Sequence, residues 1–141
     1  MKKPVEIVLR TVHLGAARRV VTLGIDGRDL ARHFLLDLLQ HDRNQFEFVR
    51  KRIQSISNYD RYENQLTFRH LGDGVFEFKR PGIRLYAFYD GIGDQQQLIL
   101  CTNGGLKGKA QSRNIQLARR LKGEYFRAKA LPDTILRLIE P

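Results

Sequence analysis

The sequence predicts one α+β domain: a small antiparallel sheet with a helical hairpin on one face, followed by a C-terminal helix. Two adjacent segments, residues 27–40 and 43–57, repeat apolar side chains every three or four positions, as amphipathic helices do. Later segments have the apolar or alternating pattern of strands, and their short links favour antiparallel neighbours. The 141 residues, 42% of them hydrophobic, suffice for a single domain with a buried core.

The first 57 residues are expected to contain a hairpin and then the helical pair. Residues 5–12 and 18–25 are rich in β-branched side chains, which predicts an N-terminal strand or hairpin within residues 1–26. Asp26 is predicted to cap the first helix. The apolar stripes of the two helices are Leu30, Phe34 and Leu38, and then Phe46, Val49, Ile53 and Ile56.

The sheet and the last helix are expected within residues 66–127. Three strand-like runs, 75–79, 83–89 and 97–102, are separated by glycine-containing turns. The third run contains Cys101 among apolar residues, which indicates a buried strand. A helix with Ile115, Ala118, Leu121 and Tyr125 on one face follows and ends at Pro132, and residues 133–139 are expected to add only a short final turn.

Charge is the most informative number in the composition. The chain has 25 Lys and Arg against 15 Asp and Glu, a net charge of +10, and such a field attracts polyanions. A single cysteine excludes a disulfide scaffold, and the four histidines are dispersed, so neither a metal site nor a cofactor is expected. No signal peptide or apolar run of about 20 residues is recognisable, which predicts a cytoplasmic protein without a membrane partner.

The cations are concentrated in the second half of the chain. Residues 103–129 contain eight Lys or Arg and one acid, Glu124. Strand alternation puts Lys79 on the face opposite Phe76 and Phe78, so it is expected to meet solvent, with Arg84 as its neighbour across the Pro81–Gly82 turn. These charges are either scattered and solvated or form a concave cationic surface for a phosphate backbone, and the local imbalance favours the second interpretation. Tyr86, Tyr89 and Tyr125 could stack unpaired bases there.

Four segments, in this order, resemble one family. They are residues 68–78 (FRHLGDGVFEF), 82–86 (GIRLY), 98–109 (LILCTNGGLKGK) and 111–125, with Ile115 and Ala118 as an "I-x-x-A" signature. Together they are similar to the RelE/HigB-like toxins of type II toxin–antitoxin systems, especially the branch first seen in phages. The helical pair fits this RelE/ParE-like fold by pattern only, and the N-terminal hairpin is longer than the usual first strand.

The resemblance implies a metal-independent endoribonuclease that cuts mRNA on the ribosome and is held inactive by an antitoxin protein. In that chemistry the 2′-hydroxyl of RNA attacks the adjacent phosphate, which requires a base, charge-compensating cations and an acid. The residues implied as catalytic are Arg84 as phosphate clamp, Lys79 as base or electrostatic stabiliser, Tyr125 as stacking residue or acid, and His70 as alternative base. The residues implied as RNA-binding are Arg80, Tyr86, Lys107, Lys109 and Arg113.

Two other functions remain open at this stage, because a fold does not determine its function. ParE-like relatives inhibit DNA gyrase on a similar fold, and a third possibility is a non-catalytic domain that binds nucleic acid or protein. Glu77 stands where some family members carry a second catalytic lysine. The nuclease hypothesis requires Lys79, Arg84, Lys107 and Lys109 to converge on one surface.

Overall fold

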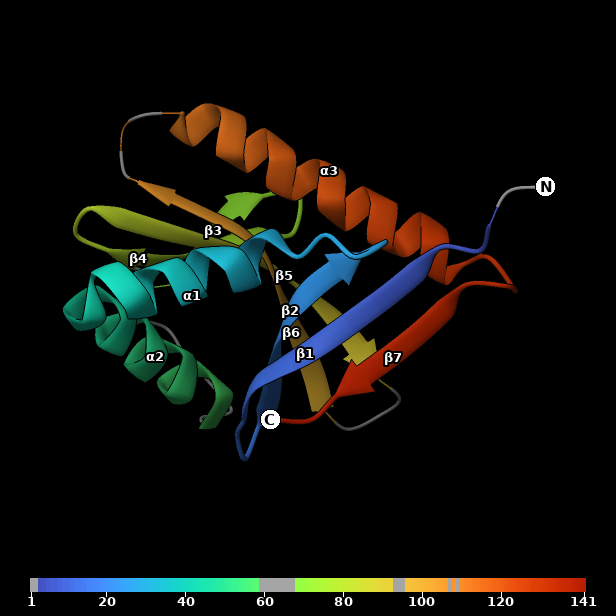
Figure 1. Cartoon of the computed structure of the whole chain (residues 1–141), viewed down its shortest axis with the longest axis horizontal. Helices are drawn as coiled ribbons and strands as arrows, with labels where there is room; N and C mark the ends of the chain where they lie inside the picture. The colour runs from blue at the N-terminus through green and yellow to red at the C-terminus, as the bar shows by residue number, and fades with distance from the viewer. Residues whose placement is uncertain (1–2, 59–67, 93–95, 107, 109) are drawn as a thin grey trace.

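A computed structural model describes residues 3–58, 68–92, 96–106, 108 and 110–141 of the chain. The elements appear in Figure 1 in the order β1 (Glu6–Leu14), β2 (Arg18–Ile25), α1 (Leu30–His41), α2 (Arg43–Asn58), β3 (Phe68–Gly72), β4 (Val75–Arg80), β5 (Ile83–Ile92), β6 (Gln96–Leu106), α3 (Gln111–Lys129) and β7 (Ile135–Ile139). No helix in the described part of the chain is long and apolar enough to cross a membrane.

The predicted α+β class is confirmed, whereas the predicted small antiparallel sheet is wrong. Among the described residues, seven strands form one mixed sheet in the order β3-β4-β5-β6-β2-β1-β7. The pairs β2–β6 and β1–β7 are parallel. Parallel neighbours need a long crossover connection, and here the helical pair with the β3–β5 meander separates β2 from β6. The short links predicted antiparallel pairing correctly for strands that follow each other in the sequence. They carry no information about the pairs β2–β6 and β1–β7, whose strands are far apart in the sequence.

The helical pair covers one face of the sheet, as predicted (Figure 1). Side chains of α1 and α2 pack there against Phe78, Leu85 and the fully buried Cys101. The predicted cap is wrong, because Asp29 and not Asp26 caps α1. The Asp29 carboxylate accepts hydrogen bonds from the Arg32 amide at 2.9 Å and from a threonine hydroxyl of β2.

The opposite face is covered by α3, which crosses the sheet from β3 toward β1 (Figure 1). The predicted apolar face of this helix is confirmed, since Ala118 and Tyr125 are buried and Ile115 and Leu121 are partly buried against the sheet. Both faces of the sheet therefore belong to the core. The expected final turn at 133–139 is wrong, because residues 135–139 form β7, a parallel edge strand beside β1.

Replacing Ala110 with glycine should stabilise the protein by about 0.5–1 kcal/mol. Ala110 precedes α3 with φ of 56°, in the left-handed region where a Cβ atom is unfavourable. Urea-induced unfolding followed by circular dichroism measures the change. Ala130, at the other end of the helix, has right-handed φ of −77°, so Ala130→Gly is the matched control and should bring no gain. Equal effects of the two substitutions would contradict this interpretation.

Candidate nucleic-acid interface

The two cations expected to be neighbours are indeed paired across adjacent strands. Lys79 on β4 and Arg84 on β5 are direct Cα partners, joined by the tight Pro81–Gly82 turn in which Gly82 has φ of +89°. Directly paired residues of an antiparallel ladder project from the same face. Lys79 and Arg84 therefore share the face of the sheet that α3 covers.

Arg84 is buried and held by a carboxylate. Its side chain is 3% exposed, and its Nε lies 3.6 Å from Oε2 of Glu77, which is itself fully buried. Arg84 Nη1 also donates to the carbonyl oxygens of Arg80 at 2.9 Å and Ile83 at 2.7 Å. On the other side of Glu77, Nη2 of the half-exposed Arg69 lies 2.8 Å from Oε1. We call Arg69, Lys79, Arg84 and Glu77 the cationic cluster.

Lys79 meets solvent as expected, but only in part, because the face of the sheet that it shares is covered. Because α3 lies over this side of the sheet, Val75 and Glu77 are buried and Lys79 is only partly exposed. Glu77 compensates one positive charge, so the cluster keeps a positive excess. A buried arginine is tolerated where such a partner offsets its desolvation. The cluster therefore combines a buried ion pair with two cations, Arg69 and Lys79, that solvent can reach.

Tyr86 lies next to the cluster in the sheet, on the face that α3 covers. It is the Cα partner of Glu77 on one side and of Asn103 on the other, and its side chain is buried. Burial raises the pKa of the Tyr86 hydroxyl, the Glu77 charge raises it further, and Arg84 opposes the shift. The hydroxyl consequently stays protonated at neutral pH and can act only as a neutral donor or acceptor.

The start of α3 lies close to the cluster. Asn103 Nδ2 donates to the backbone carbonyl of Asn114 at 3.1 Å, and a Cβ atom on Gly105 would lie 2.3 Å from the Asn114 side chain. Gly105 is the Cα partner of Arg84. The first turn of α3, with the exposed Arg113, is thereby fixed beside the strands that carry Lys79 and Arg84.

Two residues assigned to the site by sequence lie on the opposite face, with the helical pair. The Arg80 guanidinium stacks over the Phe48 ring of α2, 3.4 Å from the ring centroid. The His70 ring packs against Phe76, and its Nε2 accepts a hydrogen bond from the Gly74 amide at 3.3 Å. Neither side chain is brought to Lys79.

Tyr125 lies at the other end of the α3-covered face. Its hydroxyl donates to Asp90 Oδ2 at 2.6 Å, and the Lys129 ammonium donates to the same oxygen at 2.6 Å. Asp90 is six residues beyond Arg84 on β5, so roughly 20 Å separates the two positions. Burial and the Asp90 carboxylate raise the pKa of Tyr125. Lys107 and Lys109 lie outside the described residues.

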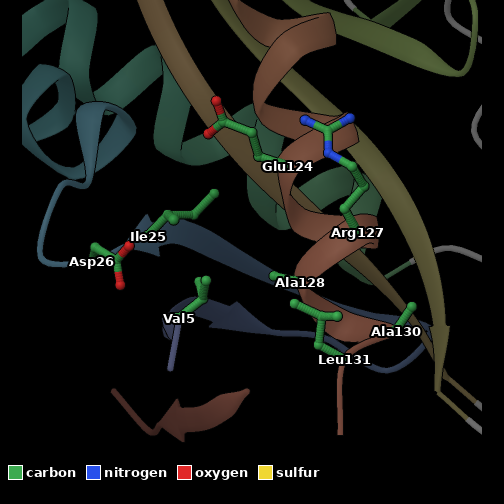
Figure 2. A pocket seen from close by; sticks show the side chains of 8 residues that line it. All are labelled: Val5, Ile25, Asp26, Glu124, Arg127, Ala128, Ala130 and Leu131. Carbon is green, nitrogen blue, oxygen red and sulfur yellow. The ribbon is translucent and has the colours of Figure 1, made fainter. Parts of the chain in front are cut away.

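A pocket of about 620 Å³, drawn in Figure 2, is lined by none of the residues of the cationic cluster. It is bounded by the ends of β1 and β2, at Val5 and Ile25, and by the last turns of α3 with Leu131. The lining is mainly apolar, and its charged residues are Asp26, Glu124 and Arg127. None of the residues assigned to the site by sequence lines it. Within the described residues, no group of three or more His, Cys, Asp or Glu gathers as a metal site.

Sequence reasoning missed Arg69 and the role of Glu77. Arg69 is the Cα partner of Glu77 across the β3–β4 hairpin. The signal was present, because the Gly72-Asp73-Gly74 turn brings the two strands together in antiparallel register. A register shift between His70 and Gly72 decides which residues face each other, and such a bulge is not readable from the pattern.

The fold and the site define an α+β protein with a buried ion pair and accessible cations at one end of a mixed sheet. Comparison with protein-family models, curated proteins and solved structures finds no match to this chain. The resemblance to RelE/HigB-like toxins therefore stays a prediction from sequence motifs.

Proposed function

We propose that this protein is a toxin of a type II toxin–antitoxin system that cleaves RNA at the cationic cluster. The observation that carries the proposal is the direct pairing of Lys79 with Arg84, with Arg69 on the same side of the sheet. A positive excess in a partly buried site stabilises developing negative charge more than the same cations in water would. A phosphate group can reach the site through the accessible Arg69 and Lys79.

The reaction is a transfer within the RNA backbone. The 2′-oxygen attacks the adjacent phosphorus and loses its proton to water, and the bond to the 5′-oxygen breaks. That oxygen takes up a proton from water, so the products are a cyclic phosphate and a free 5′-hydroxyl. Arg69 and Lys79 offset charge on the phosphorane directly, and the buried Arg84, held by Glu77, adds to the positive potential of the site.

The substrate is translated mRNA on the ribosome, in the cytoplasm. The six Lys and Arg of α3, against Glu124, add a field that attracts the RNA backbone and makes binding salt-dependent. The same field suits an antitoxin whose acidic segment covers the cluster and blocks RNA. No cofactor enters this reaction.

Expression without an antitoxin, combined with mapping of RNA 5′ ends, tests the proposal. Growth arrest should coincide with cuts inside translated reading frames that leave 5′-hydroxyl ends. Lys79→Ala should lower the cleavage rate about 100-fold or more, because it removes a cation that offsets charge on the phosphorane. Lys51→Ala is the matched control, since Lys51 is an exposed lysine of α2 on the opposite face, and it should cleave like the parent.

The buried position of Arg84 favours a second candidate, in which the cluster binds a protein instead of a phosphate. An inhibitor of DNA gyrase, as the ParE-like proteins are, would bind through a charged surface. It would not need Arg84 to reach a reacting phosphorus. Intact transcripts in arrested cells, together with a DNA-damage response, would support this candidate and overturn RNA cleavage. Normal growth on expression would instead indicate a non-catalytic binding domain.

A further inference from the structure

The outer edge of β7 ends the sheet on the side away from the cationic cluster (Figure 1). β7 pairs with β1 along one side, and no other strand in the described part of the chain pairs with its other side. The outward backbone groups of an edge strand are a template for pairing with another strand. The edge is therefore an available interaction surface.

The side chains of this edge are apolar. Ile135, Leu136 and Leu138 are 45%, 44% and 41% exposed. Leu136 and Leu138 pair with Ile7 and Leu9 of β1 and so lie on the α3-covered face, yet α3 does not bury them. They instead line an open groove of about 330 Å³ beside Tyr125 and Lys129. An exposed apolar strand of this kind marks an association site.

The features that usually protect an edge strand are missing from β7 as described. Lysines, prolines and bulges normally prevent an edge from pairing. The charged residue of β7, Arg137, is instead held at 2.8 Å by Glu6 of the neighbouring strand. Charge therefore does not oppose the approach of a second strand.

The charge distribution indicates which partner fits. The whole chain carries +10, so two copies repel each other over most of their surface. Residues 131–141 carry Arg137 against Asp133 and Glu140, and Glu140 pairs with Arg19 at 2.8 Å. The positive charge at this edge is therefore compensated, so a second copy, although cationic as a whole, is not repelled there. An acidic partner would be drawn to α3 and the cationic cluster instead.

We propose that β7 is a homodimer interface, in which the β7 strands of two copies pair antiparallel about a two-fold axis. Such an axis places the α3-covered faces of the two sheets on the same side. The same residues of each copy then contact each other, so the contact is self-complementary. A centre at Arg137 would oppose two like charges, whereas Leu136 and Leu138 would oppose apolar side chains beside the groove, so we place the centre at one of these two residues. Leu136 and Leu138 of each copy then close the groove of the other. The proposal is independent of the proposed function.

Sedimentation equilibrium at 0.5 M salt and tens of micromolar protein tests the interface. The parent should show twice the 16.4 kDa chain mass, and Leu138→Lys should return it to the monomer value. Leu36→Lys is the matched control, because Leu36 is exposed to a similar extent, 47% against 41% for Leu138, and belongs to α1 on the opposite face of the sheet. Circular dichroism checks that each variant is folded. A monomeric parent, or equal dissociation by both substitutions, would overturn the proposal.

Cysteine cross-linking tests the strand pairing itself. A residue on the two-fold axis faces its own copy with Cα atoms about 4.5–5.5 Å apart, within the range a disulfide bridges. Leu136→Cys or Leu138→Cys should therefore give a covalent dimer on mild oxidation, whereas Leu36→Cys should not. The native Cys101 is fully buried and does not compete. Failure of both edge variants to cross-link would also overturn the proposal.

Discussion

Replacing Glu77 with glutamine should lower the free energy of unfolding by about 3–5 kcal/mol, the usual effect of removing one partner of a buried ion pair. The substitution keeps the size of the side chain but removes its charge. Arg84, which is 3% exposed, would then remain buried without a compensating carboxylate, and Arg69 would lose its partner 2.8 Å away. Urea-induced unfolding at neutral pH, followed by circular dichroism, measures the loss.

Two comparison variants separate this charge effect from a general sensitivity of the fold. Glu47→Gln breaks the exposed Glu47–Arg50 pair on α2 and should leave the unfolding midpoint near that of the parent. The double variant Glu77→Leu/Arg84→Met removes both buried charges and should recover much of the stability, because well-packed apolar residues often replace a buried pair without loss. A double variant as unstable as Glu77→Gln would contradict the assigned role of the pair.

The helices were predictable because their signals are local. The apolar stripes of α1, α2 and α3 repeat within a few residues, and each stripe is buried or partly buried where expected. Only the cap of α1 was misplaced, by three residues. Asp26 forms part of a turn with φ of 50° and accepts a hydrogen bond from the Glu6 amide, which a short sequence window does not reveal.

The sheet was only partly predictable because its decisive pairings are non-local. The β4–β5 hairpin followed from a two-residue turn, and with it the pairing of Lys79 and Arg84. The parallel pairing of β7 with β1 joins residues at the two ends of the chain, and five mainly apolar residues carry no sign of their partner. The segment 135–139 was accordingly expected to be a turn.

Strand alternation explains why the candidate site differs from its prediction. Arg80 follows Lys79 directly, so it must project to the other face, where it meets Phe48. Alternation could have separated these two residues in advance. It could not show that α3 covers the face of Lys79, because the position of a helix over a sheet depends on packing between distant residues. Tyr125 is consequently held by Asp90 and not by the cluster.

Raising the pH above about 9 should destabilise the protein steeply, and Cys101 and Tyr125 alone should contribute a slope approaching 3 kcal/mol per pH unit above pH 10. Burial raises the pKa of Cys101, aided by the Asp29 charge, and burial with the Asp90 hydrogen bond raises that of Tyr125. In the unfolded chain these groups lose their protons near pH 8.5 and 10, respectively. The native state then binds more protons than the unfolded state, so stability falls as the pH rises.

The Tyr125→Phe variant isolates the contribution of Tyr125. It should be less stable than the parent at pH 8, because Asp90 loses the hydroxyl donor, and its stability should fall with a shallower slope above pH 10. A group that is ionised in the unfolded chain but still protonated in the native state contributes about 1.4 kcal/mol per pH unit to this slope. Urea unfolding between pH 8 and 11 gives both slopes. Only a proton that the native state retains can make folding depend on pH. Identical slopes for the variant and the parent would therefore show that the buried Tyr125 hydroxyl does not resist ionisation. A tyrosinate signal from Tyr125 at a pH below that of unfolding would show the same.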